Sequence, residues 1–400
     1  MKNISPLIIL LSLTAYQTAA QTDKQLERWL KRFPAADVNG DGRLSVEEAQ
    51  RFLKSRNQAS TDSASNRKDG PHNFTVDPGW GKDSFPEHAV SYKTPAEIRK
   101  IYAKQVGEGK AVVSFEQPEN GILRIVGTGH SFMGPGYKTF PQICRGAGFA
   151  QPLYTHTGGG ITGSTRYKWE QENGIFQFDG KPEPKLLASI ANAEWEAMMW
   201  GPYFHDRPEY YSCWIDFCLQ YNPGMKFYLS DAWPQLYQLD TIPDSEEFFT
   251  EAVIDKMGRE RTREYRELID TLRKNHSAEI YIMPTSDAMV LAAKHYLRGE
   301  LPGIEGFHTS IGGKKRSLWR DPLGHLGPGF DRLEGYVFYT TLYGRSPELI
   351  TNPIPFTDKG DFPSPALDRI FRKIAWQAVI ENPYSGIQDK NGDGIADRQP

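Results

Sequence analysis

The stretch Ile122-Leu-Arg-Ile-Val-Gly-Thr-Gly-His-Ser131-Phe132 decides the fold class of this 400-residue chain. An apolar run of strand length leads into glycines and a serine, which places Ser131 at the carboxyl end of a strand. The expected strands span 122–126, 152–155, 196–199, 226–229 and 279–283, and the expected helices span 137–146, 208–219, 245–274, 286–297 and 329–342. This alternation predicts an α/β fold with a parallel sheet covered by helices on both faces.

Three loops beyond the expected sheet carry residues with catalytic chemistry, and active sites of parallel sheets lie beyond the carboxyl ends of the strands. Ser131 follows the first strand, and Thr155-His-Thr-Gly-Gly159-Gly160 follows the second. Asp321-Pro-Leu-Gly-His325 precedes the last helix. A serine nucleophile needs a base and oxyanion donors. We therefore expect Ser131, His325 and Asp321 to be catalytic, with oxyanion donors at Ser131, Gly159 and Gly160.

The order of these blocks resembles the SGNH (GDSL-like) hydrolase family. Gly129-His-Ser131-Phe132 looks like the family's nucleophile block, Gly159 or Gly160 like its second-block oxyanion glycine, and Asp321 with His325 like its closing block. The resemblance covers residues 122 to about 344 and implies a flavodoxin-like three-layer α/β/α sandwich. It also implies that His325 takes the proton of Ser131 while Asp321 orients the imidazole.

Two departures from the family pattern concern the oxyanion and the closing block. The family's third block, Gly-x-Asn-Asp, carries an asparagine that donates to the oxyanion, whereas Trp200-Gly-Pro-Tyr-Phe-His-Asp206 has none. The closing block is normally Asp-x-x-His, and here one more residue separates Asp321 from His325. The sequence therefore leaves open an enzyme with fewer oxyanion donors or a catalytically inactive protein on the same fold.

A calcium loop is expected near the N-terminus, where Asp37-Val-Asn-Gly-Asp-Gly-Arg-Leu-Ser-Val-Glu-Glu48 matches the EF-hand pattern at each diagnostic position. Calcium prefers six to eight oxygen ligands, and the twelfth position supplies two of them at once. The expected ligands are Asp37, Asn39, Asp41, Arg43 through its carbonyl, Ser45 and Glu48.

A second, shorter copy of this loop lies at the other end, where Asp389-Lys-Asn-Gly-Asp-Gly-Ile-Ala-Asp397 repeats the first nine positions. The expected calcium ligands are Asp389, Asn391, Asp393, Ile395 through its carbonyl, and Asp397. The twelfth position is Pro400, so we expect a terminal carboxylate, or water with Asp397, to complete the shell. A solvated acidic tail without calcium is the alternative.

The first 20 residues have the pattern of a signal peptide. Lys2 precedes an apolar run over 6–15, and small residues precede a cleavage site after Ala20, so we expect a secreted or periplasmic protein. The expected organisation is a signal peptide over 1–20, an EF-hand module over 21–54, a flexible linker over 55–85, an SGNH-like hydrolase domain over 86–380 and the C-terminal calcium loop over 381–400.

The composition limits the partners. The formal net charge of −3 gives no basic surface, so we expect no nucleic acid partner, and no apolar segment is long enough to span a membrane.

We expect an exported, calcium-binding serine esterase that acts on a small-molecule or glycan ester, in particular acylated extracellular carbohydrate. The calcium modules could also dock the enzyme to a partner.

Two other functions remain open from the sequence. Imidazoles and carboxylates on loops at the same edge of the sheet could hold zinc for a metal-dependent hydrolase. These residues are His130, His156, His205, Asp206, Asp321 and His325. Alternatively, tryptophans such as Trp319 could stack on sugars in an inactive, calcium-dependent glycan-binding protein, although most tryptophans are expected in the core.

Overall fold

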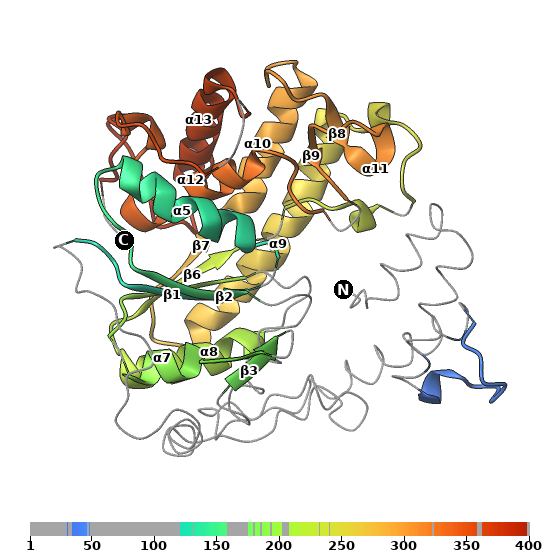
Figure 1. Cartoon of the computed structure of the whole chain (residues 1–400), viewed down its shortest axis with the longest axis horizontal. Coiled ribbons are helices and arrows are strands. Elements are labelled where there is room, and N and C mark those ends of the chain that lie inside the picture. Colours follow the sequence, from blue (N-terminus) through green and yellow to red (C-terminus); the bar gives the residue numbers. More distant parts are fainter. Residues whose placement is uncertain are drawn as a thin grey trace.

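A computed structural model gives the structure of most of the C-terminal two thirds of the chain (Figure 1). The described residues are 30, 34–45, 48, 121–129, 131–157, 175–178, 181–184, 186–192, 194–201, 208–231, 233–239, 241–321, 324–357 and 362–397. The expected signal peptide and linker lie outside them. Of the expected EF-hand module over 21–54, only residues 30, 34–45 and 48 are described.

A five-stranded parallel sheet lies at the centre of the described structure. Its strands, in order across the sheet, are β2 (Leu153–Thr157), β1 (Ile125–Gly129), β5 (Ala197–Trp200), β6 (Lys226–Ser230) and β7 (Ile280–Met283). Numbered along the chain, these strands run 2-1-3-4-5, which is the flavodoxin-like order. Every residue of β1 and β5 is buried, as a sheet covered on both faces requires.

Helices cover both faces of the sheet and complete the expected three layers (Figure 1). One face carries α5 (Gly134–Gly146), α10 (Thr285–Leu297), α12 (Phe330–Tyr343) and α13 (Pro365–Glu381); the other carries α7 (Leu186–Asn192), α8 (Pro208–Tyr221) and the C-terminal half of α9 (Glu251–Asn275). Ile125 belongs to the first core and its neighbour Val126 to the second, because successive strand residues face opposite sides. The predicted α/β/α fold is confirmed.

Several boundaries differ from the expected ones. The helix expected from residue 245 begins at Glu251, because Thr250 Oγ1 accepts the backbone N–H of Val253 at 3.3 Å and caps it there. A separate 3₁₀ turn, η7 (Glu246–Phe248), precedes it. Helix α13 was not expected, although Ser364 caps it by accepting from Leu367 N at 3.2 Å.

Smaller elements surround the sheet. The strands β3 (Ile175–Phe178) and β4 (Lys181–Pro184) form an antiparallel pair, and β8 (Gly306–His308) and β9 (Ser317–Trp319) form a parallel pair. The short helical turns are η2 (Pro34–Ala36), η6 (Leu236–Gln238), α11 (Thr309–Gly312) and η8 (Pro347–Leu349). Within the part of the chain that the structure describes, every helix is too short or too polar to cross a membrane.

Candidate active site

Ser131 lies exposed in the tight turn between β1 and α5. The turn depends on Gly129, whose φ of +136° belongs to a region that residues with a side chain rarely adopt. A Cβ at Gly129 would lie 2.6 Å from Met133 Cγ and 2.8 Å from the carbonyl oxygen of Gly201. The glycine thus lets the ends of β1 and β5 approach the start of α5, with the Ser131 hydroxyl facing outward.

The structure brings the three expected catalytic side chains into hydrogen-bond contact. His325 Nε2 lies 2.7 Å from Ser131 Oγ, and His325 Nδ1 lies 3.0 and 2.8 Å from the two carboxylate oxygens of Asp321. Because an ionised carboxylate only accepts hydrogen bonds, Nδ1 carries the proton of the neutral imidazole. The lone pair of Nε2 then faces the Ser131 hydroxyl and can accept its proton.

The turn over 321–325 holds His325 in place. Gly324 has a φ of +84° and donates its N–H to the Asp321 carbonyl at 2.9 Å, so it accommodates the additional residue between Asp321 and His325. The indole N–H of Trp233 donates to the carbonyl of Gly324. The ring of Phe132, next to Ser131, lies edge-on to the imidazole of His325, with 5.2 Å between the ring centres. Phe132 therefore packs beside both Ser131 and His325.

Asp321 remains ionised in this setting. Burial raises the pKa of its half-buried carboxyl, but the hydrogen bonds and charge of His325 outweigh burial, and the pKa falls below its ordinary value. A charged carboxylate beside Nδ1 favours the imidazolium that forms when Nε2 takes a proton. The electrostatics therefore suit His325 for acting as a general base.

Several other expected site residues lie outside the described part of the chain. Gly159, Gly160, His130, His205 and Asp206 are not among the described residues, and of His156 only the backbone, on β2, is described. Among the described residues, no group of three or more His, Cys, Asp or Glu side chains gathers as a metal centre. Of the expected oxyanion donors, Ser131 alone belongs to the described part of the chain.

A second Ser–His–Asp cluster was not expected from the sequence. His276, which ends α9, lies with Nε2 2.8 Å from Ser212 Oγ and with Nδ1 3.2 Å from Asp216 Oδ1. Ser212 and Asp216 stand four residues apart on α8, so they share one helix face. Ser212 is 1% exposed and the side chain of His276 is 5% exposed, whereas that of Asp216 is 38% exposed. The cluster joins the end of α9 to α8 with its serine and histidine buried.

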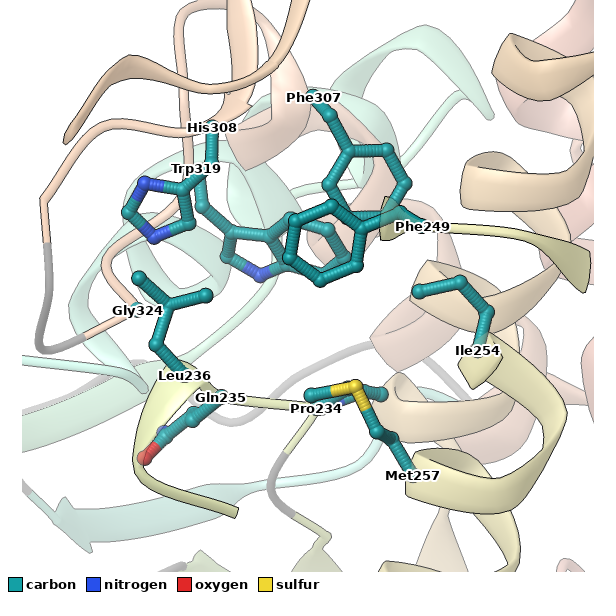
Figure 2. A pocket seen from close by; sticks show the side chains of 10 residues that line it. All are labelled: Pro234, Gln235, Leu236, Phe249, Ile254, Met257, Phe307, His308, Trp319 and Gly324. Atoms are coloured by element: carbon teal, nitrogen blue, oxygen red, sulfur yellow. The ribbon is translucent and has the colours of Figure 1, made fainter. Parts of the chain in front are cut away.

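A pocket beside Gly324 was also not expected from the sequence. It is small, with about 10 Å³ open to the centre of a water-sized molecule, and Figure 2 shows the side chains around it. It is lined by Pro234, Gln235, Leu236, Phe249, Ile254, Met257, Phe307, His308, Trp319 and Gly324. These residues come from separate segments, which no local sequence pattern connects.

The two acidic loops share the same backbone hydrogen bonds. In the first loop, Asp37 accepts the N–H groups of Gly40 and Gly42, both at 2.8 Å. In the second, Asp389 accepts those of Gly392 and Gly394 at 2.7 and 3.1 Å. Two further bonds also match, since the asparagine at position three and the aspartate at position five each accept from the residue two positions later.

The loops are closed differently. Glu48 closes the first loop by accepting from the backbone and hydroxyl of Ser45, at 3.0 and 2.7 Å. The second loop is held against the end of α12, where the Ser346 N–H donates to the Gly394 carbonyl and the Ala396 N–H donates to the Gly344 carbonyl, both at 2.7 Å. The C-terminal loop therefore packs on the α/β structure rather than extending freely from it.

Comparisons with known proteins give no family. No family model matches the chain, and no curated protein matches it significantly. A DUF4886 family protein from Bacteroides uniformis ATCC 8492 is similar at 12% identity over 64% of this chain and 93% of that chain, with a TM-score of 0.43. The lipopolysaccharide acetyltransferase periplasmic domain of Salmonella ser. Paratyphi A is similar at 12% identity over 62% and 97%, with a TM-score of 0.28. Likeness of this degree carries no argument about function.

Proposed function

We propose that this protein is an exported serine hydrolase that cleaves esters, with Ser131 as nucleophile, His325 as general base and Asp321 as the carboxylate that orients the base. The observation that carries the proposal is the 2.7 Å contact between Ser131 Oγ and His325 Nε2, backed by the contact of Nδ1 with Asp321. A nucleophile bonded to a base that a third group orients is the arrangement of covalent acyl transfer.

The reaction would proceed in two steps. Ser131 Oγ attacks the ester carbonyl carbon while His325 Nε2 takes the hydroxyl proton, and the backbone N–H of Ser131 donates to the developing oxyanion. The carbon–oxygen bond of the ester then breaks, and His325 returns the proton to the leaving alcohol. Water then attacks the acyl-serine carbonyl carbon while Nε2 takes one of its protons. The bond from Oγ to the acyl carbon breaks, the carboxylic acid leaves, and Nε2 returns the proton to Ser131 Oγ.

A fluorophosphonate probe tests this proposal because it reacts with an activated serine hydroxyl. We expect labelling of the folded, full-length protein at Ser131, found by mapping the modified peptide. Labelling should disappear in Ser131→Ala and fall about 10³-fold or more in His325→Ala. An unlabelled, folded protein would contradict the serine mechanism. Activity that survives in Ser131→Ala but not after chelation would favour the metal-dependent alternative.

The substrate class that we propose is acylated extracellular carbohydrate. The expected signal peptide and the exposed position of Ser131 support a soluble ester outside the cytoplasm as substrate. Deacetylation of acetylated polysaccharide by the wild-type protein, and not by Ser131→Ala, is the expected result. If the protein binds such a glycan without hydrolysing it, the inactive glycan-binding alternative is correct.

We further propose that both acidic loops bind Ca²⁺ as accessory sites. The repeated hydrogen-bond pattern supports this, since glycines with φ of +77° at position 42 and +80° at position 394 wrap each loop around its first aspartate. Asp37, Asn39, Asp41, the Arg43 carbonyl, Ser45 and Glu48 would hold one ion. Asp389, Asn391, Asp393, the Ile395 carbonyl and Asp397 would hold the other.

Calorimetric titration of the calcium-free protein tests the two sites separately. We expect a stoichiometry of two, which Asp37→Ala and Asp389→Ala each reduce to one. Only the ion at the second loop should raise the melting temperature of the α/β structure, because that loop packs against α12. A stoichiometry that Asp389→Ala leaves unchanged would identify residues 389–397 as an acidic tail without calcium.

A further inference from the structure

Trp233 lies between the two halves of the proposed catalytic site. It comes just beyond the end of β6, and its side chain is buried. Its ring packs on Phe132, with 4.8 Å between the ring centres, and its indole N–H donates to the carbonyl of Gly324. Phe132 follows Ser131 in the chain, and Gly324 precedes His325. One side chain therefore contacts the neighbour of the proposed nucleophile and the neighbour of the proposed base.

The backbone hydrogen bonds of the 321–325 turn set its shape and join it to β9. The Arg320 N–H donates to the His325 carbonyl, and the Gly324 N–H donates to the Asp321 carbonyl, both at 2.9 Å. Strand β9 pairs with β8 outside the five-stranded sheet (Figure 1). These bonds therefore leave the distance from the turn to the nucleophile, which follows β1 of that sheet, to other contacts.

Trp233 supplies such a contact, because the end of β6 is fixed within the sheet. Asp231 is fully buried there, and its Oδ1 accepts the Ser286 N–H at 2.8 Å, at the start of α10. Its own backbone N–H donates to a carbonyl of β7 at 3.3 Å. Gln235 adds to the contact with the turn, since a Cβ at Gly324 would lie 2.8 Å from Gln235 Cγ. The segment after β6 thus connects the turn to the sheet that carries the nucleophile.

The aromatic rings also connect Trp233 to the base itself. Phe132 packs on Trp233 with one part of its ring and lies edge-on to the imidazole of His325, with 5.2 Å between the latter two ring centres. Phe132 is 8% and Trp233 is 0% exposed, so a smaller ring at either position would leave a cavity into which the other could move. The imidazole is therefore held by Asp321 at Nδ1 and by this packing at its side.

We propose that Trp233 is a positioning residue of the hydrolase. Its indole N–H and its packing on Phe132 keep His325 Nε2 at the 2.7 Å from Ser131 Oγ that suits proton transfer. Trp233 acts through Gly324 and Phe132 rather than on the reacting atoms. Its part in catalysis rests on the proposed function, because the distance matters for turnover only if His325 takes the proton of Ser131.

Trp233→Phe tests this role, since phenylalanine keeps a ring against Phe132 and removes the donor to Gly324. The matched control is Trp195→Phe. The Trp195 indole is 4% exposed and donates to the Ser189 carbonyl at 3.1 Å, but it precedes β5 and so lies at the opposite edge of the sheet. On p-nitrophenyl acetate, Trp233→Phe should lower kcat about 10-fold to 100-fold and leave KM within about twofold. Trp195→Phe should leave both constants within about twofold.

Three results would overturn the proposal. One is an unchanged kcat in Trp233→Phe. Another is a rise in KM alone, which would mean that the ring shapes the substrate site. The third is an equal loss of kcat in Trp195→Phe, which would mean that any buried indole has the same effect. If Trp233→Phe does not fold, 3-benzothienylalanine at position 233 keeps the shape of tryptophan without the N–H, and kcat should again fall about 10-fold or more.

A measurement without turnover separates this proposal from the hydrolase. The Nδ1–H of His325, which donates to Asp321 at 2.8 Å, gives a proton magnetic resonance signal that is identified by its loss in His325→Ala. We expect this signal to broaden in Trp233→Phe and not in Trp195→Phe, because a loosened turn lets the N–H exchange with water. If the signal broadens but fluorophosphonate does not label Ser131, Trp233 positions His325 and the hydrolase is wrong. If Ser131 is labelled but Trp233→Phe changes neither the signal nor kcat, the hydrolase stands and the positioning role is wrong.

Discussion

The protein contains two Ser–His–Asp clusters with matching contacts, whose serines lie in opposite surroundings. In one, His325 joins Ser131 to Asp321 at the carboxyl edge of the sheet; in the other, His276 joins Ser212 to Asp216 between α8 and α9. Ser131 is exposed, whereas Ser212 is 1% exposed. The three residue types and their contacts therefore do not define a catalytic site, because a nucleophile must also be reached by a substrate.

The difference also lies in how each histidine is used. His276 ends a helix, and its backbone N–H donates to the Leu272 carbonyl at 2.9 Å, so it belongs to the packing of α9 on α8. His325 sits in a turn formed around a glycine with positive φ, where its side chain is 16% exposed. We expect the first histidine to matter for stability and the second for chemistry.

The largest expected effect separates the two serines. Ser131→Ala should lower the rate of ester hydrolysis about 10³-fold or more, because it removes the nucleophile. Ser212→Ala should leave the rate within about twofold, since no substrate reaches a buried hydroxyl. Initial rates on p-nitrophenyl acetate would measure both. Equal loss in both variants, in proteins shown to be folded, would contradict the assignment of the site.

The opposite order is expected for stability when the two histidines are compared. His276→Ala should lower the unfolding free energy by about 2–3 kcal/mol, because it leaves the buried Ser212 hydroxyl unpaired and creates a cavity. His325→Ala should cost less, about 1 kcal/mol, since the Ser131 hydroxyl that it leaves without this partner is exposed to water. Urea unfolding followed by far-ultraviolet circular dichroism gives both values. A larger cost for His325→Ala would mean that the exposed cluster is structural.

The smallest expected effect concerns the carboxylate of the exposed cluster. The folded-state pKa of Asp321 lies below its unfolded value, so the ionised group stabilises the folded protein above the unfolded pKa. That stabilisation is lost as the pH falls through the lower, folded pKa. Because Asp321 is partly solvent-exposed, we expect no more than about 1 kcal/mol. Asp321→Asn should remove this acid-side dependence, as unfolding measured between pH 2 and 6 would show; an unchanged profile would contradict it.

The sheet could be predicted from the sequence because each strand is a short apolar run with local turn signals. The approach of Ser131 to the 321–325 turn follows from the same pattern, since both segments lie beyond the sheet's carboxyl edge. Other features depend on distant residues. For example, Ser245 caps η7 and Thr250 caps α9, and either residue can start a helix. Between these two helical segments, the buried ring of Phe249 stacks on the distant Phe307.

The buried cluster and the pocket could not be predicted for the same reason. Ser212 and His276 are 64 residues apart and meet only because α9 crosses α8. The residues that line the pocket have no shared motif, and Trp319 alone among them was considered for binding. Local sequence patterns identify candidate catalytic residues and the edge of a sheet, whereas the burial of a side chain depends on how distant elements pack.

The hydrogen bond between Ser131 and His325 joins residues that are 194 positions apart, and this has a consequence for the protein during its synthesis. At typical translation rates, the nucleophile would leave the ribosome about 10–40 s before its base. The packing of helix α5, which follows Ser131, would also be delayed until α12 had been synthesised, because α5 packs against α12. The nascent chain would therefore lack the contact between Ser131 and His325 until more than four fifths of it had been made.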